Sequence, residues 1–297
     1  MRIFVTGATG FVGAAVVADL LKEGHQVVGL ARNEQARETI LSLGAEVHNG
    51  DLEDLESLIE GAKSADAVIH TGFIHDFSRF KEVCEIDRKA IAAMGNALIG
   101  SNRPFIVTSG TLLISGKQMI TEDMLPDYEH AVNPRIASEQ AVDLLVEKGV
   151  NVSVVRLSPS VHGNGDSRGF IPMLIDLAKK SGVSAYIGEG QNRWTAVHRL
   201  DAAVLFRLTL QNTIPGARFH GVAESSITLK AIAEAIAAKL GVPVVSKSGK
   251  EATEHFAWFE HFASVDGPAS ADSTRQRLNW NPNQPTLMED LQGNVYF

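Results

Sequence analysis

The chain has 297 residues, 44% of them hydrophobic and 21% charged, and its formal net charge at pH 7 is −8. This length can bury a full core, either as one large domain or as a main domain with a smaller lobe. The acidic balance argues against a general nucleic-acid surface. The single cysteine, Cys84, excludes an internal disulfide and fits a reducing compartment. We expect no signal peptide and no membrane span, because a strand is predicted from residue 2 and no apolar run reaches about 18 residues. A cytoplasmic protein is therefore expected.

The first predicted element is a strand over residues 2–6, followed by Gly7-Ala-Thr-Gly10-Phe-Val-Gly13 and a helix over 11–22. This is the pattern of a dinucleotide-phosphate loop between a strand and a helix. Gly7 permits the tight turn, Gly10 lets the backbone approach a pyrophosphate, and Gly13 lets the helix pack closely on the sheet. Free amides at the helix N-terminus then favour the phosphate.

The second predicted strand, residues 26–31, ends at Ala31-Arg32. Folds that prefer NAD place an acidic residue near this point for the ribose 2′-hydroxyl. A guanidinium instead suits the 2′-phosphate of NADP. We therefore predict NADPH over NADH, with Arg32 as the discriminating residue and Arg37 as a helper; the alternative is that Arg32 is a solvated surface charge.

Strand and helix patterns alternate through the rest of the first half. Further strands are predicted at 45–48, 67–70, 104–108 and 152–156, and further helices at 52–60, 77–99 and 134–147. This alternation predicts an α/β fold, a doubly wound parallel Rossmann sheet with helices on both faces. We expect residues 1–162 to form the nucleotide-binding core, and residues 163–297 to form mainly a small substrate lobe with some segments returning to the core. In that lobe, helices are predicted near 171–180 and over 229–240.

Ligands of such folds bind beyond the carboxyl ends of the strands. Asp51 follows the third strand and could bond the adenine amino group, or it could cap the next helix. A glycine after the fourth strand, Gly72, would let the backbone lie against the cofactor. Hydroxyl groups after the fifth strand, from Thr108 to Thr111, stand where a nicotinamide should lie.

Several segments together resemble the extended short-chain dehydrogenase/reductases, of the NAD-dependent epimerase/dehydratase superfamily. They are Thr6-Gly7-x-x-Gly10-x-x-Gly13, Gly50-Asp51-Leu52, the stretch from Arg156 to Gly163, Val197-His198-Arg199-Leu200-Asp201-Ala202-Ala203 and Arg277-Leu278-Asn279-Trp280-Asn281-Pro282. The resemblance spans nearly the whole chain. Motifs and resemblance together imply a cofactor site made of Gly7, Thr9, Gly10, Phe11, Val12, Gly13, Ala31, Arg32, Asp51, Leu52, Thr71, Gly72, Phe73, Thr108, Ser109, Arg135, Leu157, Pro159 and Val161.

The family's catalytic pair is missing, because no Tyr-x-x-x-Lys occurs in the sequence. When Ser138-Glu139-Gln140-Ala141 is matched to the family's stretch after its lysine, the lysine position falls at Arg135 and the tyrosine position at Ala131. The serine position falls at Gly110, between Ser109 and Thr111. This pattern resembles the atypical branches of the superfamily, which keep the glycine loop and lose the active-site pair.

A non-standard proton donor would then be needed. The catalytic candidates are Ser109, Thr111 and Arg135, of which Arg135 could take the lysine's ribose contact but could not supply a proton. The substrate-pocket candidates are His75, Tyr128, His162 and Trp258, the last from an aromatic stretch over 255–262 that could equally be core. No metal-binding spacing is present, so no metal is expected.

Three functions remain open from the sequence. The first is an NADP(H)-dependent oxidoreductase that reduces a small, hydrophobic carbonyl compound. The second is a catalytically silent NADPH-binding sensor or interaction protein, and the third is a sugar-nucleotide epimerase or dehydratase. The expected partner is a small molecule, with no nucleic acid or membrane. The resemblance also implies a homodimer through the helices near 77–99 and 134–147.

Overall fold

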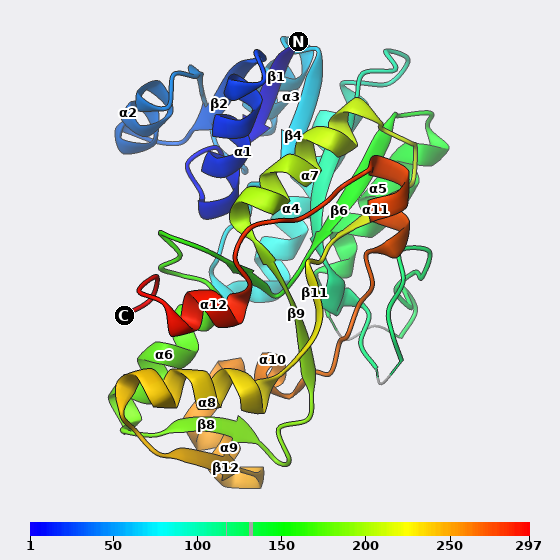
Figure 1. Cartoon of the computed structure of the whole chain (residues 1–297). Coiled ribbons are helices and arrows are strands. Elements are labelled where there is room, and N and C mark those ends of the chain that lie inside the picture. The colour runs from blue at the N-terminus through cyan, green and yellow to red at the C-terminus, as the bar shows by residue number, and fades with distance from the viewer. Residues whose placement is uncertain (117, 131–132) are drawn as a thin grey trace.

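A computed structural model describes residues 1–116, 118–130 and 133–297. Two layers of helices enclose a parallel sheet at the N-terminal end, and a smaller lobe is attached below it (Figure 1). The C-terminal segment runs back along the molecule between the two parts, ending beside the lobe. The α/β doubly wound Rossmann architecture predicted from the sequence is confirmed.

In the part of the chain that the structure describes, the large sheet has seven strands in the order β10-β6-β5-β4-β1-β2-β3. All neighbouring pairs are parallel. The order reverses beside β1, so the carboxyl ends of β1 and β4 flank the point where a nucleotide binds in such sheets. The bounds are β1 Arg2–Thr6, β2 Gln26–Ala31, β3 Glu46–Asn49, β4 Ala67–His70, β5 Phe105–Gly110, β6 Val152–Leu157 and β10 Arg218–Gly221.

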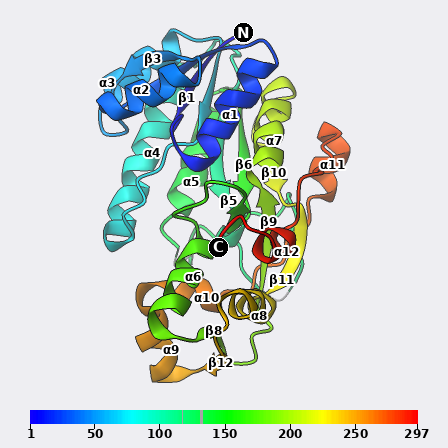
Figure 2. The ribbon, with the colours of Figure 1, turned by 60° about the vertical axis from the view of Figure 1, so that its left-hand side comes forward.

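Helices cover both faces of this sheet because its strands are apolar on both sides (Figure 2). One face carries α1 Phe11–Lys22, α2 Glu34–Ser42 and α7 Arg199–Gln211, packed on Ile3, Val5, Ile69 and Ile106. The other face carries α3 Leu55–Lys63, α4 Phe80–Asn96 and α5 Ile136–Glu147, packed on Phe4, Val68, Phe105 and Val107.

The smaller lobe has its own apolar core, centred on Trp194, Ile232 and Phe259. A two-stranded parallel sheet lies against its helices. Its elements are α6 Phe170–Ser181, β8 Ser184–Ile187, α8 Leu229–Leu240, β12 Val244–Lys247, α9 Gly249–Phe256, the 3₁₀ turn η3 Ala257–Phe259, α10 Glu260–Ser264 and α12 Leu287–Gln292.

A three-stranded sheet joins the lobe to the core, in the order β11-β9-β7. Its strands are β7 Ser160–His162, β9 Arg193–His198 and β11 Glu224–Thr228. The second half of the chain also returns to the core, because α7 packs on α1, β10 forms the sheet edge and α11 Asp272–Leu278 lies beside β10. The lobe is thus built from interrupted segments, and its position depends on both halves of the chain.

Some helices begin at other residues than predicted, because local capping sets where a helix starts. The helix predicted from residue 52 begins at Leu55, because Asp54 caps it by accepting a hydrogen bond from the Ser57 amide. The helix predicted from residue 77 is divided into a 3₁₀ turn, η1 Phe77–Arg79, and α4. The helices over residues 11–22 and 229–240 are as predicted.

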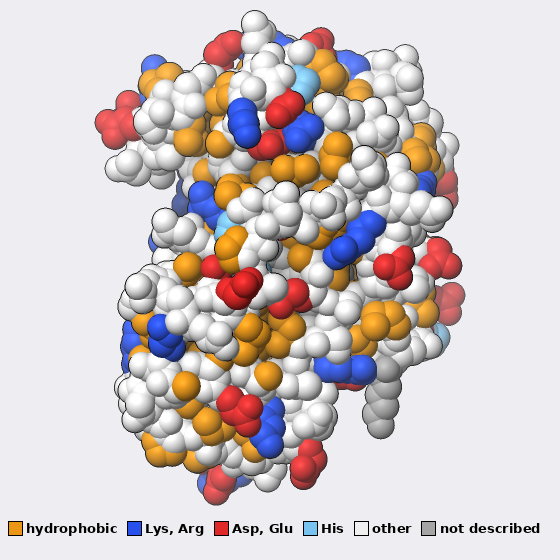
Figure 3. All heavy atoms as spheres, in the orientation of Figure 1, with side chains coloured by type: hydrophobic (Ala, Val, Ile, Leu, Met, Phe, Trp, Pro, Cys, Tyr) orange, Lys and Arg blue, Asp and Glu red, His pale blue; other side chains and the backbone are white. Residues whose placement is uncertain are grey.

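On the face shown in Figure 3, acidic and basic side chains are interspersed over both parts of the molecule. No helix of the described residues is both long and apolar enough to span a bilayer.

Candidate functional site

The glycine loop between β1 and α1 lies against the end of β4. Gly7 has φ of +69°, and a Cβ there would lie 2.6 Å from the Gly72 amide nitrogen. A Cβ at Gly13 would lie 2.0 Å from the Gly7 carbonyl oxygen. Both positions therefore require glycine, for close backbone contact as much as for chain reversal.

The loop presents an open helix end. Gly10 is the N-cap of α1, no described side chain caps this helix, and its first turn contains no acidic residue. A Cβ at Gly10 would meet only the Gly7 carbonyl oxygen, at 3.2 Å. Amides without a side-chain cap and a positive helix end suit a phosphate group, so the loop fits the dinucleotide that the fold implies.

The segment after β2 leaves an arginine exposed at the sheet edge. Arg32 forms no ion pair with any described residue, whereas Arg37 lies 3.6 Å from Glu34 on its own helix. The Oδ1 of Asp51 accepts hydrogen bonds from the Glu53 and Asp54 amides. Asp51 therefore holds the turn before α3, whereas Asp54, and not Asp51, caps that helix.

A buried polar network connects the glycine loop to the position of the missing lysine. The Thr6 hydroxyl accepts a hydrogen bond from the Gly72 amide and lies 2.6 Å from His70 Nδ1. The opposite ring nitrogen, His70 Nε2, lies 3.0 Å from Asp87 Oδ1. Asp87, on α4, is 1% exposed and pairs through its other oxygen with Arg135.

Arg135 is held on several sides at the start of α5. Besides Asp87, its guanidinium donates to the Ser138 hydroxyl at 2.7 Å and to the Thr108 carbonyl at 3.1 Å. The guanidinium carbon lies 4.1 Å from the centre of the Phe73 ring. Burial opposes ionisation of Asp87, but Arg135 and His70 outweigh it and hold the pKa of this carboxyl at about 2.

The two hydroxyl candidates at the carboxyl end of β5 form hydrogen bonds with other buried side chains. Ser109 is buried and donates to Glu139 Oε1 at 2.8 Å, and Glu139 is also paired with the fully buried Arg156. Thr111 is fully buried with its hydroxyl 3.3 Å from that of Thr195. Both hydroxyls are buried and engaged with other side chains, which disfavours Ser109 and Thr111 as proton donors.

Two pocket candidates are also misplaced. The Tyr128 hydroxyl donates to Asp143 at 2.7 Å and lies 3.4 Å from Arg218 at the start of β10, away from the carboxyl ends of the strands. His162 is fully buried, with Nδ1 2.6 Å from Asp290. Period-two burial along this segment explains the correction: Ser158, Ser160 and His162 are buried, while Leu157, Pro159 and Val161 are partly exposed.

His75 and Trp258 belong to an aromatic cluster that spans core and lobe. The His75 ring packs edge-on against Phe73 at 5.4 Å, and Trp258, half exposed, stacks on Phe77 at 4.6 Å. Phe262 lies 6.0 Å from Phe77. The aromatic stretch over 255–262 is therefore divided, with Phe256 and Phe259 in the lobe core and Trp258 at the core–lobe contact. We call Phe73, His75, Phe77, Phe80, Trp258 and Phe262 the aromatic cluster.

The surroundings of His75 are positively charged. Desolvation by the surrounding side chains and the charges of Arg135 and Arg168 lower the pKa of His75, while a hydrogen bond to the Phe73 backbone acts in the opposite direction. Among the catalytic and pocket candidates from the sequence, His75 is the titratable side chain that combines surface exposure with a position near Arg135. Ala131, where the family's tyrosine is expected, lies outside the described residues.

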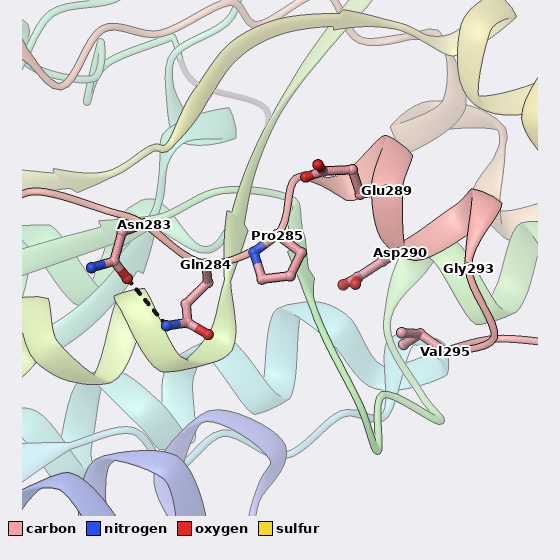
Figure 4. A pocket seen from close by; sticks show the side chains of 7 residues that line it. All are labelled: Asn283, Gln284, Pro285, Glu289, Asp290, Gly293 and Val295. Atoms are coloured by element: carbon pink, nitrogen blue, oxygen red, sulfur yellow. Dashed lines mark hydrogen bonds between the residues drawn. The ribbon is translucent and has the colours of Figure 1, made fainter.

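A hollow of about 510 Å³ lies elsewhere, on the C-terminal segment (Figure 4). Gln284 donates to Asn283 across its rim, and Asp290 in its lining holds His162. Glu289 and Asp290 make this hollow unsuitable for a phosphate group.

The remaining cysteine and metal candidates do not form a site. Cys84 is buried, which raises the pKa of its thiol to about 11. The described residues contain no cluster of metal-binding side chains.

Sequence reasoning missed the residues that organise this site. Asp87, His70 and Thr6 were not predicted to form a network, because neither periodicity nor a local motif relates α4 to β1. Glu139 and Arg156, 2.7 Å apart and fully buried, were missed for the same reason. A charged residue in an otherwise apolar helix stripe or strand was the available signal, as at Asp87 and Arg156.

Most of the chain matches a known protein family. Residues 3–220 match the NAD dependent epimerase/dehydratase family. The chain belongs to this family and is an enzyme of the NAD(P)-dependent oxidoreductase type.

Individual relatives extend the comparison. An uncharacterized protein of Schizosaccharomyces pombe is 46% identical over 297 residues, covering 100% of both chains. A 2-alkyl-3-oxoalkanoate reductase of Stenotrophomonas maltophilia is 24% identical, covering 84% of this chain and 78% of the relative. The structure of UDP-glucuronic acid 4-epimerase from Bacillus cereus, in complex with UDP-glucuronic acid and NAD, has a TM-score of 0.77 at 17% identity, covering 100% and 98% of the two chains. The last similarity supports the fold alone.

Proposed function

We propose that this protein is an NADP(H)-dependent oxidoreductase that reduces a small, apolar carbonyl compound. The observation that carries the proposal is the placement of Arg135. It is anchored to buried Asp87, stacks on Phe73 and stands where the family's lysine is expected. A charged group held this firmly beside an aromatic surface suits a pocket that orients substrate and cofactor together.

The cofactor would lie across the carboxyl edge of β1 and β4. Backbone amides of Phe11 and Val12 would hold the pyrophosphate, Arg32 the 2′-phosphate, and Arg135 the nicotinamide ribose. Bound NADPH supplies the hydride for carbonyl reduction. A preference for NADP over NAD rests on Arg32, because a guanidinium forms charge-assisted hydrogen bonds with a phosphate and an acidic residue would repel it.

His75 is proposed as the proton donor in place of tyrosine. When the carbonyl carbon receives hydride, its oxygen becomes negative, and the protonated imidazole transfers its proton to that oxygen. Because the pKa of His75 lies below its usual value of 6.5, the protonated form is a stronger acid than an ordinary imidazolium but a minor species at pH 7. The rate of reduction should therefore rise as the pH falls below 7.

An apolar substrate is supported by the aromatic cluster, which offers ring faces beside Arg135. The name of the Stenotrophomonas relative specifies an oxo compound that bears an alkyl group. A sugar nucleotide fits less well, since Arg193 in the lobe is paired with Asp266 at 2.7 Å. Exposed Trp258 is expected to contact the substrate's apolar part.

Consumption of NADPH with a panel of carbonyl compounds tests the proposal. Loss of absorbance at the reduced-nicotinamide band is expected with apolar ketones or aldehydes and not with UDP-sugars. Tight NADPH binding without turnover of any compound would instead identify a silent sensor. Turnover of a UDP-sugar alone would identify an epimerase or dehydratase.

The proton donor has its own test. The His75→Ala variant should lose roughly 10²–10⁴-fold in kcat, the usual contribution of a positioned general acid. The rise in rate toward low pH should disappear with it. His130→Ala, which removes an exposed histidine paired with Asp127, is the matched control. If the pH–rate profile of His75→Ala matches that of the parent, another group supplies the proton.

A further inference from the structure

Arg199 lies beside the glycine loop although it is far from it in sequence. Its guanidinium carbon is 5.0 Å from the centre of the Phe11 ring, and Phe11 is the first residue of α1. A Cβ at Gly165 would lie 3.4 Å from Arg199 Nη1, so the loop after β7 approaches the same guanidinium. The first turns of α1 and α7 and the loop at Gly165 therefore meet around this one side chain.

The charge of Arg199 is not neutralised by any described residue. Asp201, the acid in the first turn of α7, accepts hydrogen bonds from the Asn283 and Gln284 amides at 3.1 and 3.0 Å. Asp166, the acid in the neighbouring loop, is engaged with the Gly169 amide and the Tyr296 hydroxyl. Arg199 is partly exposed and forms no ion pair in the described structure.

The position is also unfavourable for an arginine in the free protein. Arg199 is the first residue of α7, where the helix dipole repels a positive charge. It stands next to the N-terminus of α1, which has no acidic residue and no side-chain cap. Helix stability and local ion pairing therefore both fail to explain an arginine here, whereas an anion bound at the glycine loop would be stabilised by it.

We propose that Arg199 binds the pyrophosphate of the nicotinamide dinucleotide, opposite the α1 amides. This rests on the proposed cofactor site and extends it by a residue from the second half of the chain. Phe11 would position the guanidinium by stacking, with Gly165 leaving room for it. The cofactor would then contact residues from both halves of the chain, and its pyrophosphate would be held independently of the 2′-phosphate at Arg32.

Titration calorimetry of Arg199→Ala with NADPH and NADH, combined with competition by adenosine 2′-monophosphate, tests this inference. Loss of charge-assisted hydrogen bonds should weaken both dinucleotides by a similar factor of about 10–100. Adenosine 2′-monophosphate, which lacks the pyrophosphate, should bind as it does to the parent. Arg199→Lys should lose less than Arg199→Ala, because it keeps the charge without the bidentate geometry.

Arg277→Ala provides the matched control, since Arg277 is likewise stacked on a phenylalanine, 5.2 Å from the Phe219 ring, but lies beside β10. Its dinucleotide affinities should equal those of the parent, and circular dichroism verifies the fold of each variant. Unchanged affinities in Arg199→Ala, or weaker binding of adenosine 2′-monophosphate, would overturn the pyrophosphate assignment while leaving the proposed function intact. Absence of dinucleotide binding by the parent protein would overturn both.

Discussion

The two ends of the proposed cofactor site are built in different ways. At the adenosine end, backbone geometry dominates, and Gly7 and Gly13 cannot carry a side chain without displacing backbone atoms. At the nicotinamide end, side chains dominate, and Arg135 is fixed by Asp87, Ser138 and the Thr108 carbonyl. The first end can be read from a short motif, whereas the second requires residues from β4, α4, α5 and β5 to meet.

This difference shows which part of a nucleotide site tolerates change. A glycine loop fails when one Cβ is added, so its sequence is restricted. A side-chain network can exchange one cation for another if a buried carboxylate holds the new group in place. Asp87 supplies that carboxylate here. It fixes the Arg135 guanidinium at the carboxyl edge of the sheet, so that Arg135 is not a freely solvated surface charge.

Breaking the nicotinamide end should have the largest effect. Asp87→Asn leaves Arg135 without its buried counter-charge, and breaking such a pair by removing one partner costs about 3–5 kcal/mol of unfolding free energy. Urea denaturation monitored by circular dichroism measures this change. Glu85→Gln, on the same helix but in an exposed pair with Arg88, should cost at most about 1 kcal/mol. Equal costs for the two variants would contradict the structural role of Asp87.

Disrupting the adenosine end should weaken cofactor binding more than it destabilises the fold. Gly13→Val places side-chain atoms against the Gly7 carbonyl, distorts the loop and should weaken NADPH by about a hundred-fold, equivalent to roughly 2.7 kcal/mol. Fluorescence titration of NADPH measures the affinity. Gly182→Ala, at the left-handed C-cap of α6, should cost about 1–2 kcal/mol of stability and leave the affinity unchanged. Retained affinity in Gly13→Val would show that the nucleotide does not use this loop.

Lowering the pH should destabilise the fold at the nicotinamide end, through Asp87, by a smaller amount than the substitutions above. The pKa of Asp87 is about 2 in the folded protein and 3.8 for a free side chain, so the folded state favours its ionised form. The resulting stability is fully present above pH 4 and is lost as the pH falls through 2; it amounts to about 2 kcal/mol. Melting temperatures measured from pH 5 to 2.5 should therefore fall more steeply for the parent than for Asp87→Asn. Parallel curves would contradict this assignment.

The sequence predicted the core of the fold well because its signals are local. The apolar strand at Arg2–Thr6, the glycines and the helix at Phe11–Lys22 lie within 22 residues, and each carries its own physical reason. The bridging strands β7, β9 and β11 were not predicted. They are short, they belong to a separate sheet, and their pairing partners lie more than 25 residues apart.

The catalytic end was predicted less well because burial could not be read from single residues. Ser109 and Thr111 lie at the carboxyl end of a strand, as a proton donor should, but their hydroxyls are engaged with Glu139 and Thr195. The position of Arg135 was inferred through the family resemblance, while its partner Asp87, 48 residues earlier, had no motif to identify it. Long-range pairing of buried charges is the information that a single sequence lacks.

We propose that the glycine loop and Arg32 together bind NADP(H). Calorimetric titration of the parent and of Arg32→Ala with NADPH and NADH measures both contributions. The parent should bind NADPH at least about ten-fold more tightly than NADH, and Arg32→Ala should remove this preference without weakening NADH. No heat with either nucleotide, or an unchanged preference in Arg32→Ala, would contradict it.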